Sequence, residues 1–397
     1  MDLEAIAALL TAEGWALLES LPAYDEDDAM PLGERLRAEG HPPHLVAAAL
    51  TQARLRARAR SKFGPFAAGM LFTPEGLEQA TRLSVAARHA QRFSSAGIAR
   101  VADLGCGIGS DSMALATFDR EVVAVERDDV TAAVATMNLR HWPEAVLRCE
   151  DAMTTDLAGI GAAFVDPARR TAAGKRLLDP QAGSPPLSFV LDLARRLPAL
   201  GLKTAPGIPH HLLPEGSEAQ WISVGGDVVE AGLWFGLTAR DGVRRAALVL
   251  PADGDETSTP AEVTDVGLTD PDVGPVGAVL YEPDGAVIRS GLVGQVAVAV
   301  EGRLVDRSIA YVTSERVVRT PLARAYRVDD VFPFQLKTLR TWLRDRHVGR
   351  LTIKKRGTAV EPEQLRRQLR LSGDAEATIV LTRVAGRQSV LVVRPLG

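Results

Sequence analysis

Residues 101–112, VADLGCGIGSDS, combine a short apolar run with three glycines at alternate positions. The apolar run predicts a buried strand. Gly105, Gly107 and Gly109 allow a sharp turn in which the backbone approaches a ligand without an intervening Cβ. The polar residues that follow predict a helix, whose N-terminus favours electron-rich groups. The stretch therefore predicts a strand, a ligand-binding loop and a helix in immediate succession.

The spacing of the glycines narrows the class of ligand. A phosphate-binding loop ends in Gly-Lys-Ser or Gly-Lys-Thr, and a dinucleotide fingerprint has the spacing G-x-G-x-x-G. This loop has G-x-G-x-G, with Asp103 two residues before the first glycine. The carboxylate would repel a pyrophosphate, whereas it suits a cationic ligand that carries an amino acid.

The segment around this loop alternates strands and helices. Apolar runs predict strands at 99–105, 121–127, 145–151 and 162–167, and helices are predicted at 111–118, 129–142 and 188–198. Such alternation is typical of a parallel sheet with helices on both faces. The later apolar runs, up to residue 250, follow one another too closely for helical crossovers. They predict an antiparallel hairpin at the end of the sheet.

Acidic residues follow successive strands. Glu126 ends the second strand, where an acid can accept both hydroxyl groups of a ribose, and Asp151 follows the third, where it can accept from an adenine amino group. An ordinary exposed carboxylate is the alternative for each. The fourth strand ends in "AAFVDPARR", residues 162–170. These residues form either a tight surface turn or the floor of a reaction site.

These motifs, in this order, resemble the class I S-adenosylmethionine-dependent methyltransferases. The matching stretches are "DLGCGIGSD", "AVERDD", "CEDAM" and "FVDPARR". The resemblance implies an α/β fold with a Rossmann-like seven-stranded sheet and S-adenosylmethionine as cofactor. It also implies a cofactor site made by Asp103, Gly105, Gly107, Gly109, Glu126, Arg127, Asp151 and Ala152.

The end of the fourth strand resembles the D/N-P-P-Y/F motif of the amino-methyltransferases. In that motif the acid and the first proline carbonyl accept the two hydrogens of the target amine, and the aromatic residue stacks on the base. Asp166 and Pro167 match the first two positions, but Ala168 replaces the second proline and Arg169 replaces the aromatic residue. The planar guanidinium of Arg169 can stack on a base or bind a phosphate instead. The resemblance thus implies catalytic roles for Asp166, Pro167 and Arg169.

"DPAR" also occurs in RNA uridine-C5 methyltransferases. Those enzymes require a cysteine nucleophile downstream of the motif, and no cysteine follows Cys149 in this chain. That mechanism is therefore excluded.

Segments on either side of the core extend the resemblance. "KFGPFAAGMLFTPEGLEQATRLSVAARHAQRF" before it, and "RVDDVFPFQLKTLRTWL" and "LTIKKRGTAV" after it, resemble bacterial members with a C-terminal THUMP-like domain. These are similar to trimethylguanosine synthase and RNA guanine-N2 methyltransferases. The resemblance implies an RNA substrate such as tRNA or rRNA, methylated at guanine N2 or adenine N6. A small-molecule N-methyltransferase and a non-catalytic RNA-binding protein that retains the fold remain open as alternatives.

Local charge agrees with a polyanionic partner. The 397-residue chain has a net charge of −4, but from Val331 onward it carries 14 Lys and Arg against 5 Asp and Glu. Lys354, Lys355 and Arg356, together with Arg170, are the predicted substrate contacts, and a merely solvated basic face is the alternative. The predicted organisation is a helical region at 1–70, the methyltransferase domain at 71–250, a β-rich segment at 251–328 and a THUMP-like α+β domain at 329–397.

Composition excludes several other classes. Two cysteines, Cys106 and Cys149, allow neither a disulfide framework nor a multi-cysteine zinc site, and we predict no metal. No run of about 18 apolar residues is present, so no membrane segment is predicted. The acidic N-terminus does not resemble a signal peptide, and we therefore expect a cytoplasmic protein.

Overall fold

A computed structural model describes residues 1–168, 182–255, 257–268 and 270–396. The chain divides into two compact units. Unit 1 contains Met1–Glu218 and Glu230–Asp241, and unit 2 contains Ala219–Val229 and Gly242–Gly397. These units cut across the four segments predicted from the sequence.

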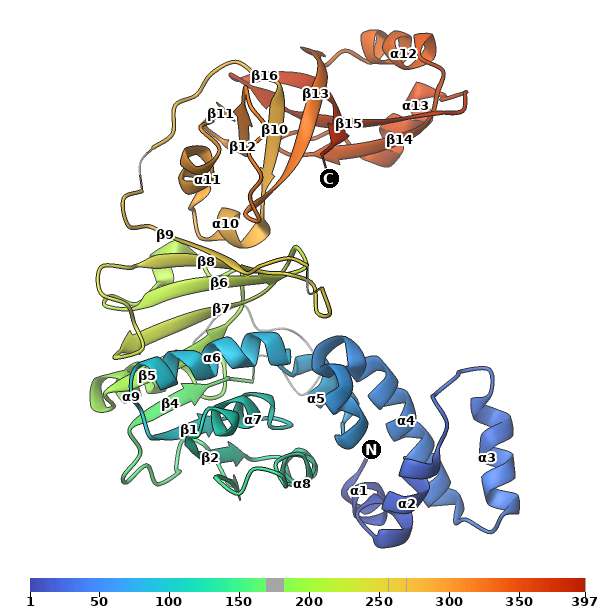
Figure 1. The fold of residues 1–397 in the computed structure, drawn as a ribbon, viewed down its shortest axis with the longest axis vertical. Coiled ribbons are helices and arrows are strands. Elements are labelled where there is room, and N and C mark those ends of the chain that lie inside the picture. The colour runs from blue at the N-terminus through green and yellow to red at the C-terminus, as the bar shows by residue number, and fades with distance from the viewer. Residues whose placement is uncertain (169–181, 256, 269, 397) are drawn as a thin grey trace. The chain divides into compact units, whose positions relative to one another are not determined.

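The N-terminal part of unit 1, up to Ser95, is helical. The side chains of Asp2 and Thr11 cap the first two helices by accepting from the backbone N–H groups of Ala5 and Gly14. Pro43 is the first residue of the longest helix, where a backbone N–H has no partner within the helix and its absence in proline therefore costs nothing. The elements are α1 (Leu3–Leu9), α2 (Ala12–Ser20), α3 (Ala29–Ala38), α4 (Pro43–Phe63), η1 (Gly64–Gly69), α5 (Pro74–Gln79) and α6 (Leu83–Ser95) (Figure 1).

The rest of unit 1 is a sheet flanked by helices. Its elements are β1 (Arg100–Leu104), α7 (Ser110–Thr117), β2 (Glu121–Glu126), α8 (Asp129–Asn138), β3 (Ala145–Cys149), β4 (Ala162–Val165), α9 (Leu187–Arg196), β5 (Ala199–Thr204), η3 (His210–Leu212) and β7 (Asp227–Gly236). The strand order is β3-β2-β1-β4-β5-β7. The first five strands are mutually parallel, and β7 runs antiparallel to β5. The predicted α/β class and antiparallel end are confirmed.

The order of the strands locates the place for a ligand. Successive strands β1 and β2 extend the sheet in one direction, and β4 then pairs with the opposite side of β1. Ligands of open α/β sheets bind at such a switch point, outside the carboxyl ends of the strands. β6 (Glu218–Val224) is the hydrogen-bonded neighbour of β7 and is joined to it by Gly225 and Gly226. The sheet continues beyond β6 and has nine strands in all, two more than the seven that the motifs imply.

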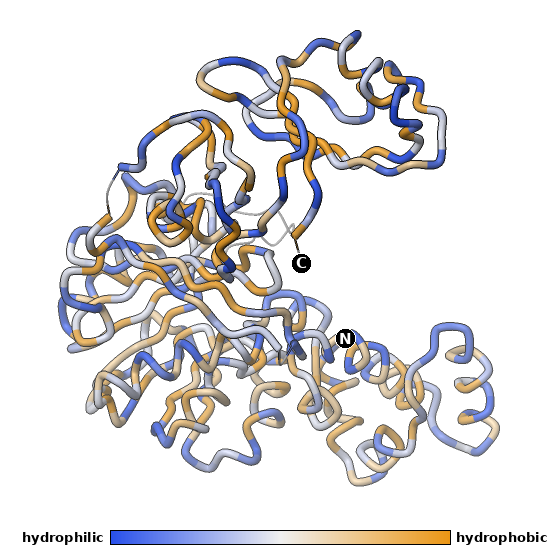
Figure 2. The backbone as a smooth tube through the Cα atoms, turned by 45° about the horizontal axis from the view of Figure 1, so that its top comes forward, coloured by the Kyte–Doolittle hydropathy of each residue, from blue (hydrophilic) through white to orange (hydrophobic). Residues whose placement is uncertain are grey.

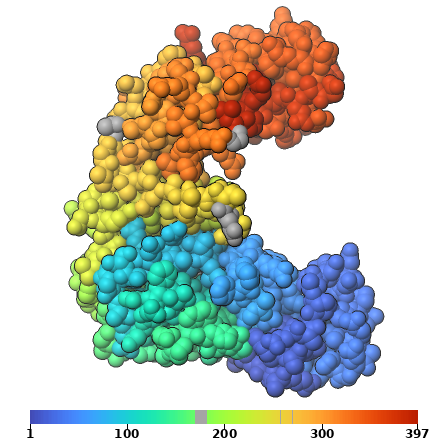
Figure 3. Space-filling model, viewed as in Figure 1, coloured from blue at the N-terminus to red at the C-terminus, as the bar shows by residue number. Residues whose placement is uncertain are grey.

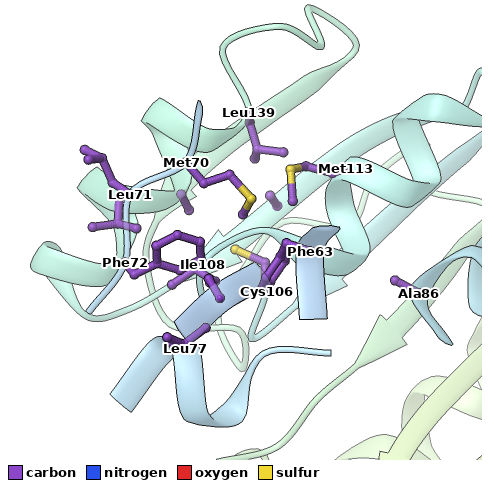
Figure 4. Packing of buried hydrophobic residues seen from close by; sticks show 14 of the residues in the cluster. Phe63, Met70, Leu71, Phe72, Leu77, Ala86, Cys106, Ile108, Met113 and Leu139 are labelled. Atoms are coloured by element: carbon purple, nitrogen blue, oxygen red, sulfur yellow. The ribbon is translucent and has the colours of Figure 1, made fainter. Parts of the chain in front are cut away.

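The hydrophobic core of unit 1 joins the helical region to the glycine loop. Phe63 and Phe72, from α4 and the segment before α5, pack with Ile108 of the loop, Met113 of α7 and Leu139 at the end of α8 (Figure 4). All five side chains are buried. Helices α1–α4 and the sheet portion of unit 1 consequently form one continuous surface in the space-filling view (Figure 3).

Unit 2 contains β6, β8 and β9, which are neighbours in that order in the first sheet, and a second sheet of seven strands. Its order is β11-β12-β10-β13-β16-β15-β14, and only β14 and β15 pair in parallel. Hydrophobic and hydrophilic stretches alternate along the chain (Figure 2). The elements are β8 (Arg245–Leu250), β9 (Ala261–Thr264), β10 (Val279–Pro283), α10 (Gly285–Arg289), α11 (Val293–Ala299), β11 (Arg303–Asp306), β12 (Ile309–Ser314), β13 (Ala323–Pro333), α12 (Leu336–Asp345), β14 (Val348–Lys355), α13 (Pro362–Leu369), β15 (Ala375–Val384) and β16 (Arg387–Pro395).

Unit 2 differs from the prediction in two respects. The segment 251–328, predicted to be β-rich, also contains helices α10 and α11. Strand β13 crosses the predicted boundary at residues 328 and 329, and it pairs with β10 on one side and with β16 on the other. One sheet therefore includes strands from both predicted segments. Among the described residues, no helix combines the length and apolarity required to span a membrane.

Candidate active site

The predicted site residues of unit 1 follow four neighbouring parallel strands. Asp103 lies in β1, Glu126 ends β2, Asp151 follows β3 and Asp166 follows β4. The carboxylate of Glu126 accepts from the backbone N–H of Gly107 at 3.2 Å and from that of Asp128 at 2.9 Å. The acid of the second strand and the glycine loop are thus in direct contact.

The glycine loop depends on backbone conformations that favour glycine. Gly105, Gly107 and Gly109 all have positive φ, at 85°, 55° and 90°. A Cβ on Gly105 would lie 2.6 Å from the backbone oxygen of Asp166, whereas one on Gly107 would meet nothing within 4 Å. The loop therefore touches the end of β4 at Gly105 and borders open space at Gly107.

Asp103 is buried beneath this loop with an unusual environment. Its Oδ2 accepts from Ser112 Oγ at 2.5 Å, but Oδ1 has no hydrogen-bond partner among the described residues, and neither has the buried hydroxyl of Ser110. Burial, followed by the nearby charge of Asp111, raises the pKa of Asp103 to about 8. A buried acceptor without a partner is costly, and an ammonium group placed near it would remove that cost. These residues fit the aminoacyl end of S-adenosylmethionine.

The other predicted cofactor residues lie around this centre. Asp151 is exposed and accepts from the backbone N–H of Met153 at 2.8 Å, and the half-buried Ala152 follows it. Arg127 donates to Ser184 Oγ at 3.3 Å, and Gly109 begins α7 against Leu139. The contacts above join Gly105 to Asp166 and Gly107 to Glu126, while Asp103 bonds to Ser112 of α7. Asp151 follows Glu150, whose N–H donates to the backbone oxygen of Glu126 at 3.2 Å.

Asp166 and Pro167 lie beside the glycine loop, as predicted for a reaction site. The backbone N–H of Asp166 donates to Leu104 O at 3.0 Å, its side chain is 24% exposed, and Pro167 is buried. The position at the strand end favours the reaction-site interpretation over a surface turn. Arg169 and Arg170 lie outside the described residues.

Sequence reasoning missed a chain of buried polar side chains behind Asp166. Lys203 Nζ lies 2.8 Å from Asp166 Oδ2 and donates to Thr81 Oγ1 at 2.9 Å. Thr81 donates in turn to Asp111 at 2.7 Å. The ring of His89 continues the chain, 2.7 Å from Asp111 and 2.8 Å from Glu230. A lysine in the apolar strand "ALGLKT" was the available signal, because a buried cation requires partners.

The charged groups in this row of buried side chains shift one another's pKa values toward the charged forms. Burial by itself lowers the pKa of His89, but the adjacent charges of Glu230 and Asp111 raise it to about 10. Burial likewise lowers the pKa of Lys203, and Asp166 and Glu230 more than reverse this. Burial raises the pKa of Asp111, yet His89 beside it brings the pKa below its ordinary value. His89 and Lys203 are therefore cations, held between carboxylates.

The predicted substrate cations of unit 2 are engaged within their own unit. Lys354 Nζ lies 2.6 Å from Glu282, and Lys355 Nζ lies 2.7 Å from Glu361. Arg356 donates to Ala310 O at 2.8 Å and lies 3.8 Å from Glu282. Their predicted contact with RNA stays a prediction, but these pairs give Lys354 and Arg356 a structural role as well. Among the described residues, no group of three or more His, Cys, Asp or Glu side chains is placed to hold a metal ion.

Comparisons with known proteins identify relatives that cover most of the chain. The chain is 33% identical over 360 residues to an uncharacterised S-adenosylmethionine-dependent methyltransferase of Mycobacterium tuberculosis, in strains CDC 1551 and H37Rv, with 88% of this chain and 95% of the relative covered. The crystal structure of a provisionally assigned methyltransferase from Porphyromonas gingivalis W83 has a TM-score of 0.70 and 21% identity, over 95% of this chain and 100% of that one. Residues 323–395 match the THUMP domain-like family, and residues 2–59 match a domain of unknown function, DUF8688.

The curated relatives define the class as methyl-transferring enzymes. The chain belongs to the S-adenosylmethionine-dependent methyltransferases. Its cofactor is S-adenosylmethionine, and its C-terminal region is a THUMP-like domain.

The contact of Glu126 with the loop yields a prediction for donor binding. We expect Glu126→Ala to weaken the affinity for S-adenosylmethionine at least about tenfold, or about 1.4 kcal/mol, the scale of a hydrogen bond to a charged group. Isothermal titration calorimetry measures this change. Glu121→Ala is the matched control, since Glu121 is an exposed acid at the amino end of the same strand. Unchanged affinity in Glu126→Ala would remove the ribose role.

The buried imidazolium yields a prediction for stability. The folded-state pKa of His89, about 10, exceeds its ordinary value of 6.5, so its contribution is complete below about pH 6.5 and is lost as the pH rises toward 10. Between pH 7 and 9 this group lowers the free energy of unfolding by about 1.4 kcal/mol per pH unit. The neutral variant His89→Gln/Asp111→Asn/Glu230→Gln should show a slope flatter by that amount in urea denaturation.

Exposed His44 provides the control for this experiment. His44→Gln should leave the pH dependence of unfolding as in the wild type, because His44 is not part of the buried chain. Equal slopes for the wild type and the triple variant would show that His89 is not held as a cation.

Proposed function

We propose that the protein methylates an exocyclic amine, guanine N2 or adenine N6, of a structured RNA such as tRNA or rRNA. The observation that carries the proposal is the contact between the glycine loop, where the donor would bind, and the end of β4, where the acceptor would bind. The backbone of Asp166, at the end of β4, adjoins the glycine loop of the donor site: a Cβ on Gly105 would lie 2.6 Å from its oxygen, and its N–H donates to Leu104 O. A carboxylate in that position suits an amine acceptor.

On the donor side, the proposed roles follow the strand ends. Glu126 would bind the ribose hydroxyls, Asp151 and Ala152 the adenine, and Asp103 with the loop glycines the aminoacyl end, with Arg127 nearby. When bound, S-adenosylmethionine supplies a methyl group already activated by its sulfonium. The chain's task is therefore to position the acceptor rather than to activate the methyl group.

On the acceptor side, Asp166 would accept one hydrogen of the amine and the Pro167 carbonyl the other. These two bonds aim the nitrogen lone pair along the line of attack, and such positioning is effective when the reacting atoms are about 3–3.5 Å apart. Arg169 and Arg170 are proposed to contact the base or a phosphate. Because an amine within a helix is inaccessible, the base must leave its stack to reach Asp166.

The THUMP-like region has exposed basic residues that could bind the phosphates of RNA. Lys337, Arg340 and Arg344 recur at helical spacing along α12, and all three are exposed. Arg340 donates to the Gln368 O of α13 at 2.5 Å, so the two helices lie together (Figure 1). Arg367 and Arg370, at the end of α13, are also exposed. We prefer this α12–α13 face for phosphate contacts because its cations are exposed, although Arg344 pairs with its neighbour Asp345 at 3.4 Å. Lys354 and Arg356, by contrast, are half-buried and lie against Glu282.

The reaction itself gives the first test. Purified protein, labelled S-adenosylmethionine and total RNA from cells lacking the gene should yield N2-methylguanosine or N6-methyladenosine after digestion to nucleosides. Asp166→Ala should lower turnover at least about a hundredfold, the scale of one lost transition-state contact, while donor affinity stays within about threefold. Asp192→Ala, an exposed acid of α9, is the matched control.

Each result of this assay has a clear meaning. Label found only in small molecules would replace RNA by a small-molecule acceptor. Donor binding without transfer to any acceptor would favour a non-catalytic RNA-binding protein. Full activity of Asp166→Ala on the identified RNA would exclude the proposed acceptor contact.

The α12–α13 face gives the second test. Lys337→Glu/Arg344→Glu should weaken RNA binding and reduce the dependence of log affinity on log salt by about 2, one for each lost phosphate contact. Arg195→Glu/Arg196→Glu has the same change of net charge. It is the control because α9 ends where β5 begins, at the amino ends of the strands. Equal loss in both variants, measured by filter binding across a salt series, would count against this face.

A further inference from the structure

Lys203 is a cation inside a strand of the sheet. It lies in β5, with a side chain only 8% exposed. Taking an ammonium out of water costs several kcal/mol unless good partners replace the water. Its Nζ has three acceptors, Asp166 Oδ2 at 2.8 Å, Thr81 Oγ1 at 2.9 Å and Gln79 O at 3.5 Å. The ammonium is therefore held on three sides, in one orientation.

The groups behind Lys203 are fixed by the same kind of contact. Thr81 accepts from Lys203 and donates to Asp111. Asp111 and Glu230 lie on the two ring nitrogens of His89, which is itself packed against the rings of Phe164 and Trp234. From Asp166 to Glu230 the charges alternate in sign, and rotation of any member would leave a buried neighbour unpaired. These buried side chains behind Lys203 consequently hold its ammonium group in place.

Asp166, at the other end, is the member that reaches the surface. Its side chain is 24% exposed, against 8% or less for Lys203, Asp111 and His89. A partly exposed aspartate without an anchor would sample several rotamers. The contact with Lys203 selects one of them, at the point where the glycine loop adjoins β4.

We propose that Lys203 is a positioning residue for methyl transfer, which fixes the Asp166 carboxylate in the orientation that receives the acceptor amine. The proposal rests on the proposed amine-methyltransferase function. Lys203 is too deeply buried to contact the substrate, so it acts through Asp166. Because Asp166 and Glu230 raise the pKa of Lys203 above its ordinary value, the ammonium persists through the neutral and moderately alkaline range.

A double-mutant cycle tests this role. Lys203→Met should lower kcat at least about tenfold, with the KM for RNA and the donor affinity within about threefold, because the lost orientation matters at the reacting centre. Asp166→Asn retains an acceptor oxygen but no charge that needs an ammonium. In the Asp166→Asn background, Lys203→Met should lower kcat less than about threefold, because the effects of residues that act through each other are not additive. An equal loss in both backgrounds would overturn the proposal.

The pH profile adds a readout that a merely structural role would not change. The titratable groups around Asp166 in the described part of the chain include Lys203 of β5 and Asp103 of β1, and beyond Lys203 lie Asp111, Glu230 and Lys62. A carboxylate that loses its ammonium neighbour binds a proton more readily. The acid limb of kcat should therefore move to higher pH in Lys203→Met and return toward the wild-type position in Lys203→Arg. An unmoved limb in Lys203→Met would contradict the proposal.

Two further variants keep the test decisive. Lys62 Nζ donates to the backbone oxygens of Leu77, Glu78 and Ala80 at 2.8, 2.7 and 2.9 Å, so Lys62→Met is a control for loss of a neighbouring lysine and should leave the pH limb unmoved. If Lys203→Met fails to fold, Thr81→Val replaces it in the cycle. This variant removes one anchor of the ammonium and should lower kcat only where Asp166 is present.

The cycle also separates this proposal from the proposed function. If Asp166→Ala and Asp166→Asn both keep full activity, the acceptor role fails, and the role of Lys203 fails with it. If Asp166→Ala is inactive while the effects of Lys203→Met and Asp166→Asn simply add, the amine-methyltransferase function stands and only the positioning role is overturned.

Discussion

Charge compensation inside unit 1 is the constraint on which the site depends. Lys203 and His89 are buried cations, and the sheet can close around them only because Asp166, Asp111 and Glu230 lie between and beside them. Removing one partner from a buried ion pair typically costs about 3–5 kcal/mol. Because these carboxylates follow β4, begin α7 and lie in β7, the same contacts that neutralise the cations also fix these three elements around the glycine loop.

Much of this arrangement could be predicted from the sequence, because it depends on local patterns. The apolar runs predicted β1–β4, and the spacing of the glycines predicted the loop whose positive φ angles the structure shows. The polar chain behind Asp166 could not be predicted in this way. Lys203 is 37 residues from Asp166, and His89 is 141 residues from Glu230. No helical or strand period relates such positions, and only the fold brings them together.

The C-terminal cations show a second limit of sequence reasoning. Counting charges in residues 331–397 correctly finds an excess of positive charge, but it cannot tell which cations are already paired. Glu282, which pairs with Lys354 and lies near Arg356, belongs to the preceding segment. It was therefore absent from the count. The two segments share one sheet through β13, and an acid on β10 can for that reason neutralise cations at the end of β14.

The position of Glu230 in the chain has a consequence for synthesis on the ribosome. Unit 1 is discontinuous, and its last part, Glu230–Asp241, which contains most of β7, follows Ala219–Val229 of unit 2 in the sequence. His89 thus emerges 141 residues before Glu230, a delay on the order of ten seconds at bacterial elongation rates. Of the two carboxylates that contact the His89 ring in the folded protein, only Asp111 has been synthesised during that interval. A nascent chain that ends at Glu218 contains the glycine loop, Asp166 and Lys203, yet its charge network is incomplete, so unit 1 reaches its final form only when translation has passed β7.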